Sequence, residues 1–366
     1  MIEDVYLKLG ERLNENFVKM ILSEPFLKIL REFYTEEQAT LGASFPLGTH
    51  TVPDLAKQLS RNEKELADLL EDMADKGLVF VSETEDGQIE YCLMSFAPGV
   101  VDYTMMRGMD TPEHRKKAQM LDEFFRSMWG EGPVLELMKD PEMLKQIMPE
   151  PFFRTITVEE ALPSGIEIYP FEKLSELVDR EESFAAAHCY CRHREYLLGN
   201  PCKVEGVPDC SCLTFGKIAD YVAARKFGKR ITKQECMDIL KSTERAGMVH
   251  NVSNFINRIV AVCNCCSCCC DGVLKPLKKF ENKAWLGYSN FGVTVDEQSC
   301  SGCGDCLERC QMQALSLADE VILINEDRCI GCGNCVAVCP EKSLSMKRRK
   351  HDKPPEVDPA SIRGGV

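Results

Sequence analysis

Cysteine is the residue type whose number and spacing in this chain could do chemistry. The chain has 366 residues and 21 cysteines, and these fall into groups: Cys92 stands alone, twelve lie between Cys189 and Cys270, and eight lie between Cys300 and Cys339. The N-terminus has no apolar core followed by a small-residue cleavage site, so we expect a cytoplasmic protein with reduced thiols rather than a disulfide framework. Clustered thiolates in such a compartment most often bind metal.

The eight C-terminal cysteines form a tandem repeat with a constant offset of 29 residues. The two copies are Cys300-Ser-Gly-Cys303-Gly-Asp-Cys306-x3-Cys310 and Cys329-Ile-Gly-Cys332-Gly-Asn-Cys335-x3-Cys339. A C-x2-C-x2-C loop wraps tightly around one iron–sulfur cluster and offers three thiolates to three irons. Glycines at 302, 304, 331 and 333 allow the backbone to turn without Cβ clashes.

This repeat resembles the bacterial two-cluster [4Fe–4S] ferredoxin module, over about 60 of the 366 residues. In that module the fourth cysteine of each copy ligates the other cluster. The resemblance therefore implies one cluster on Cys300, Cys303, Cys306 and Cys339, and a second on Cys329, Cys332, Cys335 and Cys310. One departure is Gln311, where the family usually has proline. Zinc is the alternative metal, but two interlocked copies with glycines argue against it.

The cysteine-rich middle contains the same spacing once more, at Cys263, Cys266 and Cys269. This register predicts three ligands of a third [4Fe–4S] cluster, and the fourth ligand would come from Cys191, Cys202 or Cys212. Cys265 and Cys268 form a second register that leaves thiolates for another metal. A four-thiolate zinc knot that staples the domain is the alternative.

The order of four motifs carries a wider resemblance. They are Cys189-x-Cys191-Arg192, Arg230-Ile-Thr-x-x-Glu235, Ala246-Gly-Met-Val-His250-x3-Asn254 and the run Cys263–Cys270. This order is similar to that of large ferredoxin-type 4Fe–4S binding proteins of strict anaerobes, over roughly residues 150–346. The resemblance implies metal binding and names no reaction.

Three side chains beside the middle cysteines are candidates for catalysis: Arg192, Arg194 and His250. Residues 181–280 carry 15 basic and 10 acidic side chains, or +5, so this region could hold an anionic substrate or balance cluster charge. Alternatively, the arginines belong to a basic turn exposed to solvent. His250 and Asn254, four residues apart on one predicted helix, could instead be a capping or core pair. No G-x-G-x-x-G and no P-loop accompanies them.

The elements that must position these residues predict a multidomain α+β protein. We expect a winged-helix-like domain, a helical connector, a helical Cys-rich domain, a two-cluster ferredoxin domain and a basic, proline-containing tail, at residues 1–104, 105–180, 181–280, 288–346 and 347–366.

The N-terminal prediction rests on a helix, a turn, a second helix and a hairpin, the order typical of a winged helix. The helices are Val52–Leu59 and a second one capped by Ser60 and Glu63 and stopped at Gly77; the hairpin turns at Asp86-Gly87. Residues 61–77 carry three basic and six acidic side chains, which phosphates would repel. The segment is therefore interpreted as an interaction module rather than a DNA reader.

Composition agrees with that choice. The net charge is −14, a poor basis for general nucleic-acid binding, and no apolar run is long enough to cross a membrane. The sequence thus predicts an iron–sulfur electron-transfer protein with redox partner proteins and no named substrate. An oxidoreductase with chemistry at the middle metal site is the alternative, and a redox-responsive winged-helix regulator is a third possibility.

Overall fold

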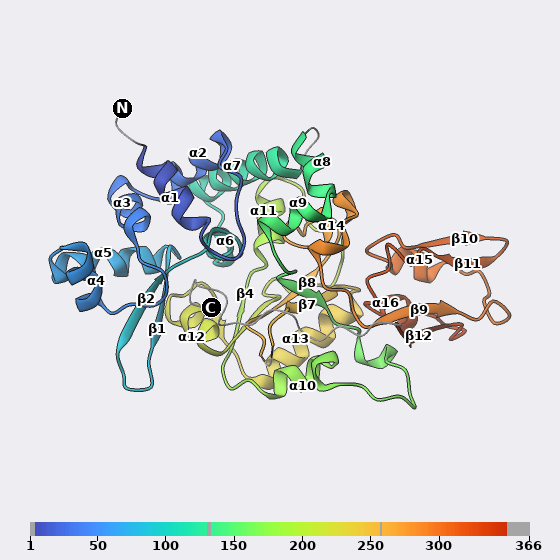
Figure 1. Ribbon diagram of the computed structural model, residues 1–366. Helices are drawn as coiled ribbons and strands as arrows, with labels where there is room; N and C mark the ends of the chain where they lie inside the picture. Colours follow the sequence, from blue (N-terminus) through green and yellow to red (C-terminus); the bar gives the residue numbers. More distant parts are fainter. Residues whose placement is uncertain (1–3, 130–132, 257, 350–366) are drawn as a thin grey trace.

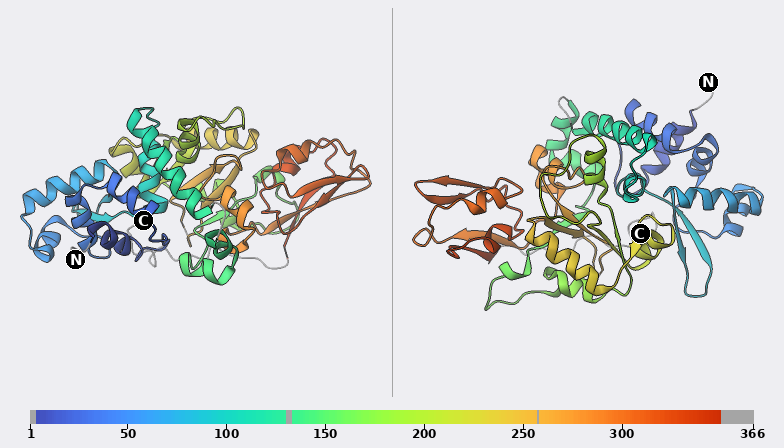
Figure 2. Two further views of the ribbon diagram at one scale, coloured as in Figure 1. Left: turned by 90° about the horizontal axis from the view of Figure 1, so that it is seen from above. Right: turned by 180° about the vertical axis from the view of Figure 1, so that it is seen from behind.

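The computed structural model describes residues 4–129, 133–256 and 258–349, and it has three parts in space (Figure 1). Helices of the N-terminal third lie at one end, a six-stranded sheet with its helices lies in the middle, and the cysteine repeat forms a separate lobe at the other end. Figure 2 shows the same order from above and from behind. Within the described residues, no helix is long and apolar enough to cross a membrane.

The N-terminal part is a set of short amphipathic helices closed by a hairpin. Its elements are α1 (Val5–Leu13), α2 (Glu24–Phe33), α3 (Glu36–Ser44), α4 (Val52–Leu59), α5 (Glu63–Asp75), β1 (Val79–Glu83) and β2 (Ile89–Leu93). The expected hairpin through Gly87 is present, with β1 and β2 antiparallel. The expected cap was misplaced: Asn62, not Ser60, caps α5 by accepting the Lys64 and Glu65 amides, and Ser60 adopts the left-handed conformation that ends α4.

Helix α5 lies against the central part rather than in solvent. The Arg225 guanidinium donates to Glu71 at 2.8 Å and to Asp75 at 3.0 Å, so it pairs with two of the acidic residues of this helix. The buried Tyr221 hydroxyl donates to the carbonyls of Ala74 and Val79 at 2.9 and 2.8 Å. These contacts fix the helix–hairpin unit to α12 (Gly216–Ala224) of the central part.

The predicted connector is only partly helical. It contains α6 (Val101–Met106), α7 (Pro112–Trp129), α8 (Pro133–Lys139), α9 (Pro141–Ile147) and α10 (Leu174–Asp179), and between the last two lie β3 (Phe153–Thr155), η2 (Glu159–Ala161) and η3 (Pro170–Glu172). Strand β3 pairs with β7 (Val249–Ser253) of the central sheet, so this sheet extends across the boundary expected at residue 180. A three-residue strand has too little periodicity to be recognised without its partner.

The middle part was expected to be helical, and it is built instead on an antiparallel sheet in the order β3-β7-β8-β5-β4-β6. Its other strands are β4 (Phe184–Ala187), β5 (Cys212–Phe215), β6 (Lys229–Arg230), β7 (Val249–Ser253) and β8 (Ala261–Cys265). Its helices are α11 (Tyr190–Leu197), α12 (Gly216–Ala224), α13 (Lys233–Arg245) and α14 (Leu274–Phe280). The capping box of Thr232 and Glu235 at the start of α13 is present as expected.

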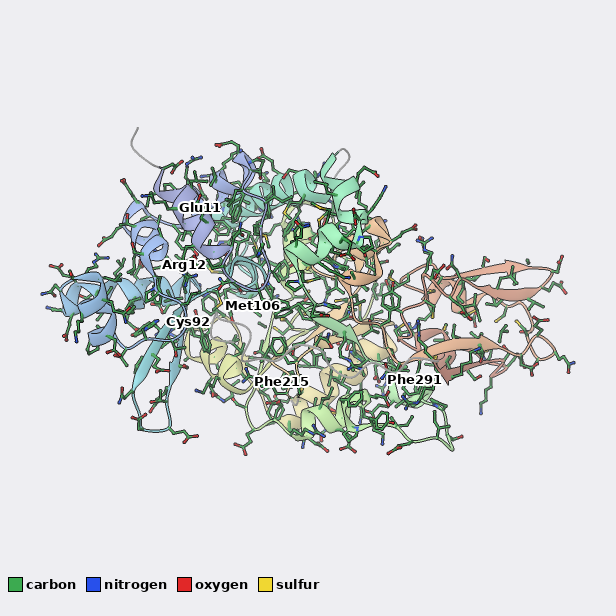
Figure 3. The ribbon with its side chains drawn as sticks, in the orientation of Figure 1. Glu11, Arg12, Cys92, Met106, Phe215 and Phe291 are labelled. Atoms are coloured by element: carbon green, nitrogen blue, oxygen red, sulfur yellow. The ribbon has the colours of Figure 1, made fainter. Side chains whose placement is uncertain are left out.

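Strand alternation decides which side chains meet which layer. Leu213, Phe215 and Val262 point to one face, where they pack with residues of α10 and α13 (Figure 3 labels Phe215). Their neighbours Cys212 and Cys263 point to the opposite face and join the core shared with the N-terminal helices. Successive strand residues face opposite sides, so this alternation sends the cysteines of β5 and β8 towards α6 and α7.

The C-terminal lobe has two antiparallel strand pairs, each with a short helix. They are β9 (Phe291–Val295) with β12 (Leu344–Arg348), β10 (Leu315–Ala318) with β11 (Val321–Ile324), and the helices α15 (Asp305–Arg309) and α16 (Asn334–Ala337). A 3-10 turn, η4 (Lys283–Trp285), precedes the lobe.

The basic segment assigned to a tail belongs in part to the fold. Lys347 and Arg348 are in β12, and Arg348 donates to the buried Glu172 at 2.7 and 2.9 Å. The rest of the expected tail, residues 350–366, lies outside the described residues.

Candidate metal centres

The C-terminal lobe contains two small cavities, each lined by four cysteines. One is bordered by Cys300, Cys303, Cys306 and Cys339, and the other by Cys310, Cys329, Cys332 and Cys335. Each set takes three cysteines from one copy of the repeat and one from the other, the grouping that the ferredoxin resemblance implies. Four thiols around one cavity offer the donor set of a [4Fe–4S] cluster.

Glycines let the cysteine loops pass close to other backbone. A Cβ at Gly302 would come 2.7 Å from the Glu320 carbonyl oxygen, and one at Gly331 would clash with the Phe291 carbonyl oxygen. Both residues also have a positive φ, of 66° and 77°. Any other residue would push the loop away from its cavity, so these positions need glycine.

The cavity bordered by Cys310 and Cys332 is the one nearer to the central sheet. The Val158 amide donates to the Cys332 carbonyl at 2.9 Å, and Asn334, next to Cys335, donates to the carbonyls of Gly247 and Met248 at 3.1 and 3.0 Å. By contrast, Cys303 of the other cavity is exposed. The lobe therefore has an inner and an outer cavity.

Gln311, the departure from the ferredoxin pattern, has a structural role. Its side chain accepts from the Ser267 amide at 2.9 Å and donates to the Gly247 carbonyl at 3.2 Å. Ser267 lies inside the run Cys263–Cys270, so one glutamine ties the inner cavity to the cysteine-rich loop. Proline at this position would offer neither group.

Four cysteines of the central part meet at one point: Cys202, Cys266, Cys268 and Cys269. Their sulfurs all lie within 4.8 Å of one another, and among the described residues no other group of three or more potential ligands is this compact. Cys202 comes from the loop between α11 and β5, and the other three come from the loop after β8. A hydrogen bond with Cys266 lowers the pKa of Cys202 to about 6, which favours a thiolate there at neutral pH.

The spacing of these sulfurs fits a single metal ion. The Cys202 Sγ atom lies 3.6 Å from the Sγ of Cys266 and 3.7 Å from the Sγ of Cys268. The Sγ atoms of Cys268 and Cys269 are also 3.7 Å apart. Thiolates about 2.3 Å from one tetrahedral Zn²⁺ are separated by about 3.8 Å, the edge of the tetrahedron. A [4Fe–4S] cluster binds each thiolate to a different iron and needs wider spacing. The donor set therefore fits Zn²⁺, or one iron ion with four thiolates.

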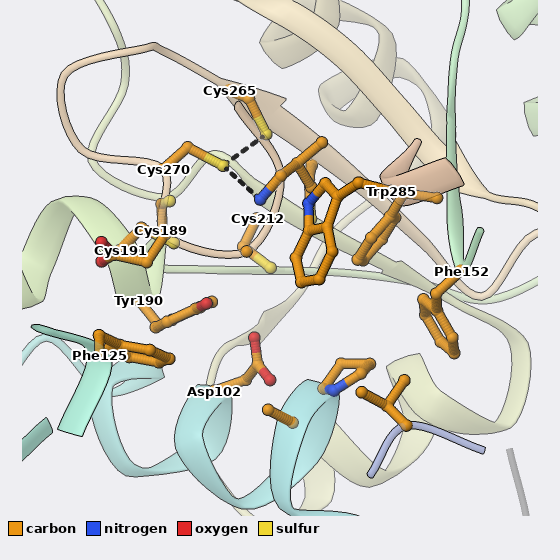
Figure 4. A pocket seen from close by; sticks show the side chains of 18 of the residues that line it. Asp102, Phe125, Phe152, Cys189, Tyr190, Cys191, Cys212, Cys265, Cys270 and Trp285 are labelled. Carbon is orange, nitrogen blue, oxygen red and sulfur yellow. Dashed lines mark hydrogen bonds between the residues drawn. The ribbon is translucent and has the colours of Figure 1, made fainter. Parts of the chain in front are cut away.

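The remaining middle cysteines, apart from Cys210 and Cys236, line a larger cavity. Cys189, Cys191, Cys212, Cys263, Cys265 and Cys270 share its wall (Figure 4). Cys266 borders this cavity too, but Cys263 and Cys212 lie outside the compact group that Cys266 and Cys269 form, so the expected register of Cys263, Cys266 and Cys269 is not one compact set. Cys191 likewise lies with this wall, and only Cys202 of the three proposed fourth ligands joins the compact group.

Local hydrogen bonds perturb the thiols on this wall. Burial raises the pKa of Cys191, but hydrogen bonds from Cys189, Cys270 and Tyr190 outweigh it and lower the pKa well below its usual value. The hydrogen bond with Cys191 raises the pKa of Cys189. One thiol of the set is therefore the preferred site of negative charge.

The three candidate catalytic residues are held in structural contacts. Arg194 is 1% exposed and pairs with Asp271 at 2.6 Å, Glu195 at 2.8 Å and Asp122 at 3.2 Å, so its charge is already balanced. Arg192 donates to the carbonyl of Pro208 at 2.9 Å and to Ser211 at 3.2 Å. These contacts order the loop that carries Cys202, and an anion-binding role for Arg192, which borders the larger cavity, stays a prediction.

His250 was expected on a helix leading into the cysteine run, and it lies on strand β7 instead. Its ring is buried, with Nδ1 2.6 Å from Asn264 and Nε2 3.3 Å from Glu244. Asn254 lies just after the strand and donates to the Pro151 carbonyl at 3.1 Å. The predicted helical pairing of His250 and Asn254 is therefore wrong.

Three cysteines of the N-terminal and central parts, Cys92, Cys210 and Cys236, stand apart from both sulfur groups, in keeping with a packing role. Cys236 is fully buried between α13 and the sheet, where burial raises its pKa to about 12. Cys92 is buried on β2 in the N-terminal part, far from the others (Figure 3). The third-site prediction left out Cys189 and Cys270, and it assigned Cys265 and Cys268 together to another metal. The alternation of Cys263 and Cys265 along a strand was the signal that could have found the cavity wall.

Comparison with known proteins bears on the C-terminal lobe. Residues 293–346 match the family described as 4Fe-4S dicluster domain. No curated protein and no solved structure was found to match the chain. The winged-helix resemblance of the N-terminal part therefore stays a prediction, although helices and hairpin follow the expected order. The chain is an iron–sulfur protein with a ferredoxin-type [4Fe–4S] region at residues 293–346 and a compact cysteine group in its central part that could bind a metal.

Proposed function

We propose that this chain is an electron-transfer protein with two ferredoxin-type [4Fe–4S] clusters and a third metal centre at Cys202, Cys266, Cys268 and Cys269. The observation that carries the proposal is the pair of cavities whose cysteines cross between the two repeats. A bound [4Fe–4S] cluster takes up and releases one electron at a time. The residues of the chain decide where such electrons enter and leave.

The C-terminal lobe favours electron transfer from its outer cavity to its inner cavity. Its outer cavity carries the exposed Cys303, and exposed acidic side chains at Asp305, Glu308 and Glu320 surround the same part of the chain. Residues 288–346 carry three basic and nine acidic side chains, so a redox partner with a basic face would be attracted to this end. The inner cavity contacts the central part through Gln311 and Asn334, which gives electrons a route inward.

The contacts of α5 favour this function over a DNA-binding regulator. Acidic side chains of the helix pair with Arg225 of the same chain, so part of the face that would read DNA is used internally. The remaining charge of α5 would repel phosphates. In this proposal the N-terminal part has a structural role, because it packs against the central part and supports its sheet.

An oxidoreductase is the second candidate, favoured by the cavity next to the middle cysteines. A cavity of about 110 Å³ lies between α6, α7 and the sheet, with aromatic side chains on one side and thiols on the other. Such an enclosed apolar pocket is the usual form of a small-molecule site. Electrons that reach the central part would then have a place to be used.

The crossed ligand sets are tested by paired variants of the full chain, purified without oxygen. Cys300→Ser and Cys339→Ser should change the same signal in the EPR spectrum of the dithionite-reduced protein, although they lie in different copies of the repeat. Cys310→Ser and Cys329→Ser should change the other signal. Cys92→Ser, which alters a buried cysteine of the N-terminal part, is the control and should change neither.

Two results would contradict the proposal. If Cys300→Ser matches Cys310→Ser rather than Cys339→Ser, each repeat ligates its own metal and the crossed reading is wrong. The electron-transfer function is also contradicted if dithionite-treated protein shows no iron–sulfur EPR signal, reduces no acceptor, and contains zinc in the C-terminal lobe. If the rate of reduction by a basic partner does not change with salt concentration, the acidic end of the lobe is not the docking surface.

A further inference from the structure

Six thiols form a continuous row along one wall of the central cavity. The thiol of Cys191 forms hydrogen bonds with those of Cys189 and Cys270. The thiol of Cys265 forms hydrogen bonds with those of Cys270 and Cys263. The closest pair with a defined distance is Cys270 and Cys265, whose sulfurs lie 3.4 Å apart. Cys212 completes the row, because it is the cross-strand partner of Cys263. The row joins α11, β5, β8 and the loop that follows β8.

Backbone donors point at the sulfurs of this row. The amides of Val273 and Leu274 donate to the Cys270 sulfur at 3.3 and 3.5 Å, and the Gly272 amide donates to the Cys191 sulfur. Amide hydrogen bonds to sulfur are the environment that iron–sulfur sites provide for their thiolates. A row of neutral thiols packed as small hydrophobic groups would not need three amides from one turn.

The row is too spread out for one ion. Among the described residues, the compact group at Cys202 is the one in which all ligand atoms lie within 4.8 Å, and no cysteine of the row belongs to it. The eight cysteines of the matched dicluster region do not form such a group either. Cys265 and Cys270 are spaced as two thiolates on one metal ion would be, and the other sulfurs of the row are spread around the cavity, as the ligands of the dicluster region are.

We propose that Cys189, Cys191, Cys212, Cys263, Cys265 and Cys270 hold a polynuclear iron–sulfur centre whose free side faces the cavity and meets a small, uncharged, largely apolar ligand. Six thiolates exceed the four that one [4Fe–4S] cluster uses, which leaves ligands for a larger centre. This site is separate from the four-sulfur site and does not depend on the dicluster lobe transferring electrons.

The opposite wall of the cavity determines the class of ligand. Phe125, Phe152 and Trp285 cover it, and Tyr190 and Asp102 add a hydroxyl and a carboxyl group to the cavity lining (Figure 4). Of the cationic side chains at its border, Arg192 is hydrogen-bonded to the adjacent loop and Lys19 is exposed at the edge. An apolar wall of this kind favours a neutral ligand, which the carboxyl and hydroxyl groups could orient.

Metal content tests the centre. Anaerobically purified full chain should contain more iron and sulfide than the eight irons of two [4Fe–4S] clusters. Cys191→Ser and Cys270→Ser should each remove several irons while the zinc content and the EPR signals of the dicluster lobe stay unchanged. Cys236→Ser is the matched control, since it alters a buried cysteine of α13 that belongs to neither sulfur group, and it should lose no iron.

The retained zinc and dicluster signals show that a variant has folded, so a loss of iron cannot be confused with unfolding. Wild-type protein with no iron beyond the dicluster, or Cys191→Ser and Cys270→Ser with unchanged iron, would overturn the proposal and make the row free thiols. A disulfide between Cys265 and Cys270, found by mass spectrometry of anaerobic protein, would overturn it as well.

A neutral probe tests access from the cavity. A small alkyl isocyanide, which binds iron and carries no charge, should change the Mössbauer spectrum of the irons that depend on Cys191 and leave the dicluster irons unchanged. Phe152→Arg, which places a charge in the apolar wall, should weaken this effect at least tenfold. An isocyanide that changes no spectrum, or only that of the dicluster, would overturn the assigned ligand site.

Discussion

Asp102 on α6 should make the stability of this protein depend on pH. Its side chain is enclosed next to the cysteine row, and burial raises its pKa from 3.8 to about 7, although it accepts a hydrogen bond from the Gly99 amide at 2.6 Å. In the unfolded chain the carboxyl ionises near its ordinary pKa. Between these two values the folded state holds a proton that the unfolded state has lost, so stability falls as the pH rises through this window.

The size of the effect follows from the two pKa values. At 1.36 kcal/mol for each unit of pKa, ionising Asp102 in the folded protein costs about 4 kcal/mol at pH 8. Asp102 borders the cavity, and water there would reduce the penalty, so about 2 to 4 kcal/mol is expected. Asp102→Asn keeps an acceptor for the Gly99 amide and never ionises. For a chain of 366 residues this gain corresponds to about 3 to 5 °C in the unfolding midpoint.

The assay is a comparison of apparent midpoints for wild-type protein and Asp102→Asn, without oxygen and at one scan rate, from pH 4.5 to pH 8. The unfolding midpoint of Asp102→Asn should exceed that of wild-type protein only slightly at pH 4.5 and by the full value of about 3 to 5 °C at pH 8. Asp68→Asn, at an exposed position of α5, is the control. A gain for Asp102→Asn that is equal at both pH values, or a loss at pH 8, would refute the reasoning, because only a proton held in the folded state gives this sign.

Three further predictions test the contacts between the parts. Cys268→Ser should remove one tetrahedral metal ion per chain and leave the irons of the dicluster lobe in place; metal analysis that finds four irons missing instead would show that the tetrahedral spacing was misread. Gln311→Ala should speed hydrogen exchange of the Ser267 amide roughly tenfold, since it loses its acceptor, whereas Gln298→Ala should not. Arg225→Ala should lower stability by about 1 kcal/mol because its carboxylate partners are partly exposed, and Arg230→Ala, whose pair with Asp220 is exposed, should have a smaller effect; equal losses would argue against docking through α5.

The parts of the fold that depend on local sequence were predictable. The two cysteine repeats bring each ligand set together within 40 residues, and the helix start at Thr232 and the turn at Gly87 follow from side chains a few positions apart. Such features need no knowledge of the rest of the chain.

The central sheet could not be predicted in the same way. Strand β4 is a buried run rich in alanine, a residue that favours helices, and every residue of β7 is buried, so neither strand shows alternation. Their pairing across long stretches of chain overrides local preference. This error carried over to His250, which was placed on a helix, and to Cys263, which was assigned to a C-x2-C-x2-C loop although it lies on strand β8.

The run Cys263–Cys270 supplies both sulfur groups of the central part, and this has a consequence for the maturation of the protein. Cys266, Cys268 and Cys269 meet Cys202 in the compact group, and their neighbours Cys265 and Cys270 line the cavity, which Cys266 borders as well. An ion bound at the first group restrains the backbone that presents the second, so it lowers the entropy cost of assembling a cluster there. Loading is therefore expected to be ordered: cells short of zinc would produce a chain that also takes up iron poorly, even with iron in ample supply.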